Sequence, residues 1–175
     1  MADPNALDLI RIPSDVLVAL DWRPYHFALQ PYHYLVRLTH VVSMAAFFGG
    51  IAALDLRLMG WRATLPLRPF ADLVLPWLYV TFGIALVSGV ALFFYDPVHV
   101  GSHAYFSLKL LLTVLGLFNA ALFRRNAYFA AFEAPTSAIP SAHVRLVGAV
   151  SLALWTGVVV CACLNVEAAP KMLLR

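Results

Sequence analysis

Long uninterrupted apolar runs, rather than an alternation of apolar and polar residues, set the pattern of this chain. A helix that crosses a hydrocarbon core of roughly 30 Å needs about 20 mostly apolar residues. Strands of a membrane barrel are shorter and alternate apolar with polar positions, so the pattern disfavours them. Four stretches are long enough for helices, and they are residues 34–58, 71–95, 104–123 and 143–165. The pattern therefore predicts an all-α, four-helix transmembrane bundle as one domain, residues 34–175.

The amino-acid composition narrows the class of protein further. Hydrophobic residues make up 62% and charged residues 12% of the 175 residues, whereas an ordinary soluble domain has roughly 25% charged residues. Such a chain is too hydrophobic for intrinsic disorder, and its 2 cysteines are too few for a disulfide scaffold. It also lacks the basic face of a nucleic-acid-binding domain, so nucleic acid is not an expected partner. An integral membrane protein remains.

The first 33 residues are too polar for a further span, and they lack the basic start and long apolar run of a signal peptide. Ser14 follows a proline and is placed to cap a short helix. Trp22, Tyr25 and Phe27 then supply amphipathic rings that suit the lipid headgroup layer. Residues 1–33 are therefore predicted to form an interfacial segment, with a short helix over the outer mouth of the bundle.

Basic residues near the ends of the spans predict the orientation in the membrane. The connection at residues 96–103 has no Lys or Arg. The other two connections are flanked by Arg57, Arg62, Arg68, Arg124, Arg125 and Arg145. Because cytoplasmic connections carry an excess of Lys and Arg, we expect a multi-pass protein of the bacterial inner membrane with both termini in the periplasm.

Ionisable residues inside the spans are the candidates for function, because a charged group in hydrocarbon is costly. At 100° per residue, the side chains of His33, Arg37, His40 and Asp55 fall on one stripe of the first span. Lipid offers no hydrogen-bond partners, so this stripe is predicted to face the interior of the bundle.

Two more polar residues lie at the start of the third span. His103 begins that span, and Lys109 follows about two turns deeper. The first and third spans run in the same direction, so we expect their outer halves to lie side by side. His33, Arg37, His40, His103 and Lys109 would then form one cluster near the outer face.

Imidazoles combined with two cations are typical of a b-type haem site, because haem needs axial ligands and positive partners for its propionates. His40 is the deepest histidine of its stripe and is the first candidate for a ligand of the haem iron. His103 or His33 is the candidate for the second ligand, and Arg37 and Lys109 are the candidates for the propionates. The predicted function is a haem-b-binding subunit that transfers electrons near the outer face, with quinone or a periplasmic redox protein as partner.

Two other functions stay open from the sequence. The first is a cofactor-free accessory subunit of a larger membrane complex, which would use a small-residue helix face formed by Ala149, Ala153, Gly157 and Cys161. The second is a transporter or sensor of a metal ion or small anion at the same outer cluster. No nucleophile and base occur at motif spacing, so no catalytic residue is predicted.

The connection after the second span contains a second group of possible metal ligands, with a less specific spacing. Asp96, His99 and His103 are ligand types that suit copper or zinc. Their spacing alone does not specify a site. Cys161 and Cys163 point to different faces of a helix and are interpreted as packing residues.

A run of residues at the end of the first span carries a family resemblance. About four turns after His40 the chain reads Asp55-Leu56-Arg57-Leu58-Met59-Gly60. This stretch resembles the first helix of a bacterial family of small four-helix integral membrane proteins of unknown function, in which a histidine precedes the signature Asp-Leu-Arg-Leu-Leu-Gly. Further parts of the resemblance are Ser88-Gly89, Phe106 to Lys109, Asn119, and Ser151 to Trp155. The resemblance implies four spans and no particular activity; the residues that it singles out are His40, Asp55, Arg57, Lys109 and Asn119.

Asp55 and Arg57 are expected to have a structural role at the cytoplasmic end of the first span. Asp55 is predicted to pair with Arg124 or Arg145, which would lock this span to the third or fourth. Arg57 is predicted to meet the lipid headgroups.

Overall fold

A computed structural model describes residues 11–126 and 140–167, and these residues form helices and connecting turns without a β-strand. In chain order the elements are α1 (Ser14–Ala19), α2 (Arg23–Leu29), the 3₁₀ helix η2 (Gln30–Tyr32), α3 (His33–Leu58), α4 (Leu67–Tyr95), α5 (Pro97–Gly101), α6 (Ala104–Asn126) and α8 (Ala142–Glu167). The first ten residues of the predicted interfacial segment, and both chain termini, lie outside the described residues.

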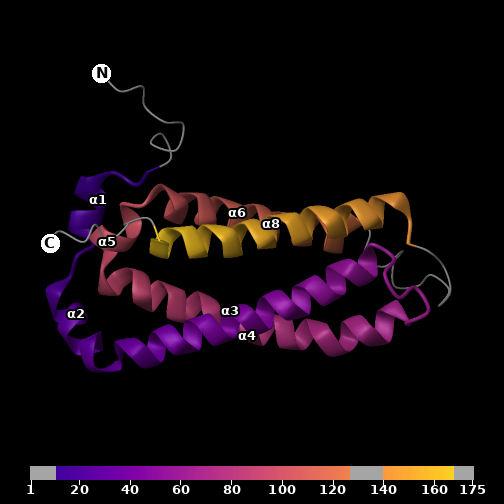
Figure 1. Cartoon of the computed structure of the whole chain (residues 1–175), viewed down its shortest axis with the longest axis horizontal. Helices are drawn as coiled ribbons and strands as arrows, with labels where there is room; N and C mark the ends of the chain where they lie inside the picture. Colours follow the sequence, from indigo (N-terminus) through magenta and orange to yellow (C-terminus); the bar gives the residue numbers. More distant parts are fainter. Residues whose placement is uncertain (1–10, 127–139, 168–175) are drawn as a thin grey trace, which may run out of the picture.

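Four of the helices are long and apolar enough to cross a membrane: α3 with the residues before it, α4, α6 and α8. The predicted all-α four-helix bundle is thus confirmed, and the chain has the architecture of a multi-pass membrane protein. Three short helices, α1, α2 and α5, gather at one end of the bundle, which we call the α5 end (Figure 1). The opposite end, which carries the connection between α3 and α4, is called the loop end.

The four long helices form two antiparallel hairpins, α3 with α4 and α6 with α8. The hairpins join mainly through α3 and α8. At the loop end a Cβ on Gly148 of α8 would lie 3.0 Å from the backbone oxygen of Asp55, so glycine allows close approach of the two helices there. At the α5 end the two hairpins contact each other through α4 and α6, where the rings of Phe93 and Phe106 stack at 5.1 Å.

This packing differs from the expected side-by-side arrangement of the first and third spans. α6 packs chiefly on α8, because Gly116 and Gly157 let Trp155 and Leu112 of the facing helix approach closely. α3 packs on α4 and α8 instead. The main packing partners of α3 and α6 are therefore other helices, and not each other.

Aromatic side chains fill the centre of the bundle. Trp155 on α8 meets Phe47 on α3 edge-on at 4.7 Å and Phe82 on α4 at 5.9 Å. Phe47 and Trp155 are buried. This aromatic layer, formed by Phe47, Phe82 and Trp155, separates the polar residues of the two halves.

Residues 11–32 lie over the α5 end of the bundle. Leu17 of α1 is buried against Gly101 of α5, where a Cβ would collide with it. The Tyr25 hydroxyl of α2 donates to the carbonyl of Ala91 at 3.2 Å. The predicted capping role of Ser14 is wrong: α1 begins at Ser14, its N-cap residue is Pro13, and no side chain caps it.

Candidate functional site

His40 is held against α4 by a pocket built from small residues. Its Nδ1 lies 2.9 Å from the carbonyl oxygen of Ala85 and 3.2 Å from the hydroxyl of Ser88. A carbonyl oxygen can only accept, so Nδ1 carries the hydrogen and donates it. The Ser88 hydroxyl donates to the Ile84 carbonyl at 2.6 Å, which leaves its oxygen free to accept. The opposite ring nitrogen, Nε2, therefore has a free lone pair.

Glycine at position 89 makes this placement of the ring possible. A Cβ on Gly89 would lie 2.9 Å from Cε1 and 3.3 Å from Nδ1 of His40, closer than ordinary contact. Ala85, Ser88 and Gly89 occupy one face of α4 at helical spacing. The sequence presents Ser88-Gly89 as a recognisable pair, but only the structure assigns the pair to His40.

Lys109 of α6 faces the same region from the other hairpin. Lys109 is half-buried, and its charge acts on the His40 imidazole of α3 and on the Cys161 thiol of α8. Its ammonium lies 5.6 Å from the centre of the Phe106 ring. Among the described residues no carboxylate pairs with this half-buried cation. Lys109 thus adds a positive charge that acts on His40 and has no anionic partner among the described residues.

The other three predicted haem residues do not join His40 and Lys109. His33 stacks on Tyr95 at 4.3 Å, about 10 Å from His40 along the same helix. Arg37 is exposed on α3, and the His103 ring meets the His99 ring at 5.5 Å. No group of three or more His, Cys, Asp or Glu side chains within residues 11–126 and 140–167 is arranged to hold a metal ion.

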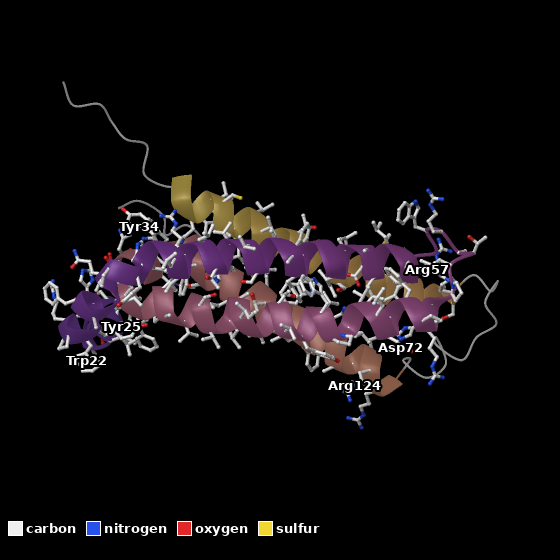
Figure 2. All side chains as sticks on the ribbon, turned by 90° about the horizontal axis from the view of Figure 1, so that it is seen from below. Trp22, Tyr25, Tyr34, Arg57, Asp72 and Arg124 are labelled. Atoms are coloured by element: carbon white, nitrogen blue, oxygen red, sulfur yellow. The ribbon has the colours of Figure 1, made fainter. Side chains whose placement is uncertain are left out.

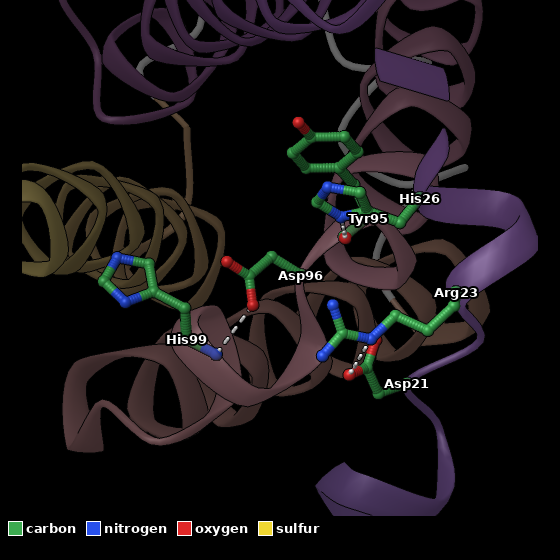
Figure 3. A network of polar contacts seen from close by, with 6 residues as sticks. All are labelled: Asp21, Arg23, His26, Tyr95, Asp96 and His99. Carbon is green, nitrogen blue, oxygen red and sulfur yellow. Dashed lines mark hydrogen bonds and ion pairs between the residues drawn. The ribbon is translucent and has the colours of Figure 1, made fainter. Parts of the chain in front are cut away.

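A second aromatic cluster lies at the α5 end, and the sequence did not reveal it. His26 of α2 stacks on Tyr95 at 4.3 Å with an angle of 14° between the rings, and its Nδ1 donates to the Tyr95 carbonyl at 2.8 Å. His33 stacks on the same phenol ring at an angle of 26°. Since the three rings are nearly parallel, Tyr95 lies between the two imidazoles and ties α2 to α3 and α4. Figure 3 shows His26 beside Tyr95.

An apolar groove of about 350 Å³ lies between α2 and α4. Its lining residues are Trp22, Tyr25, Val87, Val90, Ala91 and Phe94. His40 does not line this groove. The groove is therefore separate from the site formed by His40 and Lys109.

At the loop end, Arg57 is buried rather than placed at the lipid headgroups, so that prediction is wrong. Its Nε donates to the Leu65 carbonyl at 2.8 Å, and its Nη2 donates to the Ala63 carbonyl at 3.1 Å. Gly60 and Arg62 have φ angles of 101° and 53°, which turn the connection back toward α3. The arginine therefore organises the turn between α3 and α4.

Asp55 is buried with an exposed fraction of 2%, and it makes no ion pair with Arg124 or Arg145 among the described residues. Ser151 of α8 interacts with the Asp55 carboxyl group, and Oδ2 has no hydrogen-bond partner among the described residues. Figure 2 shows Arg124 directed away from the bundle. The predicted pairing is wrong, although Asp55 does link the first span to the fourth.

Comparisons with known proteins add no relative: no family model matches the chain, and neither the curated proteins nor the solved structures contain a match. Membership in the four-helix family that the sequence resembles therefore stays a prediction.

Proposed function

We propose that this chain is a haem-b-binding subunit of a bacterial membrane, in which His40 supplies an axial ligand to the iron and electrons are transferred near the outer face. One observation carries the proposal. The His40 ring is fixed through Nδ1 and its Nε2 is free, while the charge of Lys109, which has no carboxylate partner among the described residues, acts on the same imidazole.

The tautomer of His40, with the hydrogen on Nδ1, is one that a metal-binding histidine can use. Histidines that bind a metal usually donate the other ring N–H to a backbone carbonyl or a carboxylate, which sets the tautomer and the ring orientation. The Ala85 carbonyl has this role for His40. The tautomer of the ring is therefore already the one in which Nε2 could bind iron.

Lys109 supports an anionic cofactor in particular. A cation inside a bundle loses the solvation of water, and it is stabilised only by a counter-charge or by hydrogen bonds. A haem propionate supplies such a counter-charge, and the iron supplies one-electron redox chemistry when haem is bound. Lys109 is therefore the proposed propionate partner. Arg37 is exposed and stays a prediction for this role.

The second axial position is not assigned to a residue, because neither His33 nor His103 contacts His40. The helix ends that carry Arg57, Arg68, Arg124 and Arg145 lie at the loop end, so the positive-inside rule favours a periplasmic α5 end. Quinone in the membrane or a periplasmic redox protein is then the proposed partner for electron transfer.

The absorption spectrum of detergent-purified protein tests the proposal, with the protein produced in cells supplied with a haem precursor. We expect a Soret band and a reduced-minus-oxidised difference spectrum in the unaltered protein. His40→Ala should lose both, and Lys109→Met should bind haem more weakly. His143→Ala is the matched control, because His143 is exposed on α8 at the loop end. Absence of a Soret band before and after purification overturns the proposal, as does a His40→Ala protein with full haem content.

A cofactor-free accessory subunit is the second candidate, and α6 is the observation that favours it. Among the four spans, α6 is the one least covered by the rest of the described chain. Its exposed apolar residues include Leu110, Leu111, Val114, Leu117 and Phe118. Purification in mild detergent supports this function if a second membrane protein co-purifies without haem and Val114→Trp on α6 abolishes the association. The accessory function is contradicted if cells that lack this protein keep all their membrane complexes intact and active.

A further inference from the structure

Two histidines in the turn between α4 and α6 face each other at the surface of the α5 end. His99 lies on α5, and His103 lies just before α6. Their ring centres are 5.5 Å apart, and the ring planes are nearly perpendicular at 83°. No ring nitrogen of either residue makes a hydrogen bond within the described part of the chain. Both imidazoles therefore keep a lone pair for an external ligand.

The backbone that carries the two rings is firmly held. The Asp96 carboxylate accepts the His99 backbone N–H at 3.0 Å, as Figure 3 shows, and the Ser102 hydroxyl donates to the His99 carbonyl at 3.1 Å. Gly101, which lies between the two histidines, is covered by Leu17 of α1. The separation of the rings is thus set by the fold as well as by side-chain rotamers.

The observed separation fits one shared metal ion. A metal bound about 2.0 Å from a ring nitrogen lies about 3 Å from the ring centre, so a tetrahedral angle places two ring centres about 5 Å apart. The 5.5 Å between the His99 and His103 rings is close to this value. Two imidazoles four residues apart on a helical turn are also a known arrangement of metal ligands.

We propose that His99 and His103 form a two-histidine site for a divalent late transition-metal ion, with water completing the coordination. Nitrogen ligands of this kind bind Cu²⁺ more strongly than Ni²⁺ or Zn²⁺, and they bind Mg²⁺ and Ca²⁺ poorly. The Asp96 carboxylate, one turn away, adds a negative charge that favours a cation. The site is separate from His40 and does not depend on haem.

Titration of tag-free purified protein with Cu²⁺ against a competing chelator at pH 7 tests the site, because an added histidine tag would itself bind copper. We expect one ion per chain and a paramagnetic resonance spectrum with nitrogen hyperfine coupling. His99→Ala and His103→Ala should each lower the affinity for Cu²⁺ by at least about tenfold, since each removes one of two protein ligands. His143→Ala should leave the affinity unchanged.

Two outcomes overturn the metal site. One is a His99→Ala/His103→Ala double variant that binds Cu²⁺ as tightly as the unaltered protein. The other is a His103→Ala variant that keeps its Cu²⁺ affinity but loses haem, which would assign His103 to the iron. A folded His40→Ala protein that loses haem but keeps its Cu²⁺ affinity supports the metal site, and the haem proposal can fail without affecting this result.

Discussion

The bundle contains two regions with inward-facing polar side chains, and these side chains differ in the partners that the chain gives them. At the loop end, Arg57 donates to two backbone carbonyls, and Asp55 is buried beside α8. In the half nearer the α5 end, His40 has one nitrogen bonded and one free, and Lys109 has no carboxylate among the described residues. The aromatic layer lies between the two regions.

The difference separates structural from functional polar groups inside a membrane protein. Arg57 is buried and held by two carbonyls of one turn, so it serves the fold, although its Nη1 has no hydrogen-bond partner among the described residues. A group that is fixed on one side and free on the other still has interactions to offer a ligand. Arg57, which is buried and doubly bonded, is therefore assigned a structural role, whereas the half-buried His40 and Lys109 are the candidates for binding.

The largest effect on stability is expected from a substitution in the aromatic layer that separates the two regions. Trp155→Ala would remove the contacts of the indole with Phe47 and Phe82 and leave a cavity. We expect a loss of about 3 kcal/mol in the free energy of unfolding, at the low end for such changes because the surrounding lipid is also apolar. Reversible denaturation in detergent micelles measures this loss. Trp61→Ala, at an exposed position, is the control.

The structural assignment of Arg57 predicts the next largest effect. Arg57→Met keeps the length of the side chain but leaves the carbonyls of Leu65 and Ala63 without their donor. We expect a loss of about 2 kcal/mol in the same denaturation measurement, as for buried bonds to a charged donor. Arg62→Met, on the exposed part of the same turn, should change stability by less than about 0.5 kcal/mol. Equal effects of the two substitutions would contradict the structural role of Arg57 in this turn.

Sequence reasoning succeeded for the four spans because each span has its own apolar run, which is a local property. The prediction that the polar stripe of the first span faces the interior holds for His40, which bonds to α4, and is wrong for Arg37, which is exposed. Helix pairing could not be predicted in this way. The approach of α6 to α8 depends on Gly116 and Gly157 meeting particular side chains of the other helix.

The same limit explains the errors at the two ends. The predicted headgroup contact of Arg57 assumed an open connection, whereas the turn folds back and offers two carbonyls. The stacking of His26 and His33 on Tyr95 requires α2 to be placed over α4, which no periodicity encodes. Contacts between distant short segments were therefore missed.

Two glycines of α4 offer a test of the His40 pocket with a smaller effect. A Cβ on Gly89 would press on the His40 ring, whereas a Cβ on Gly83 would meet no atom within 4 Å. Gly89→Ala should therefore destabilise the chain by about 1 kcal/mol through overpacking. Gly83→Ala should stabilise it by about 0.5 kcal/mol, because alanine favours the helix. Denaturation of both variants measures the difference, and equal effects would mean that His40 does not occupy this pocket.

The smallest expected effect tests whether Lys109 is a binding residue. A cation that serves to bind a ligand should contribute little to the stability of the ligand-free protein. In haem-free protein, Lys109→Met should change the free energy of unfolding by no more than about 0.5 kcal/mol, since the loss of a cation–π contact with Phe106 is offset by the loss of an unpaired charge. This contrasts with the loss expected for Arg57→Met, although both substitutions remove one inward-facing cation. Denaturation of haem-free Lys109→Met measures the effect. A loss of more than about 1 kcal/mol would show that the chain itself stabilises the ammonium, and Lys109 would then belong with Arg57 among the structural residues.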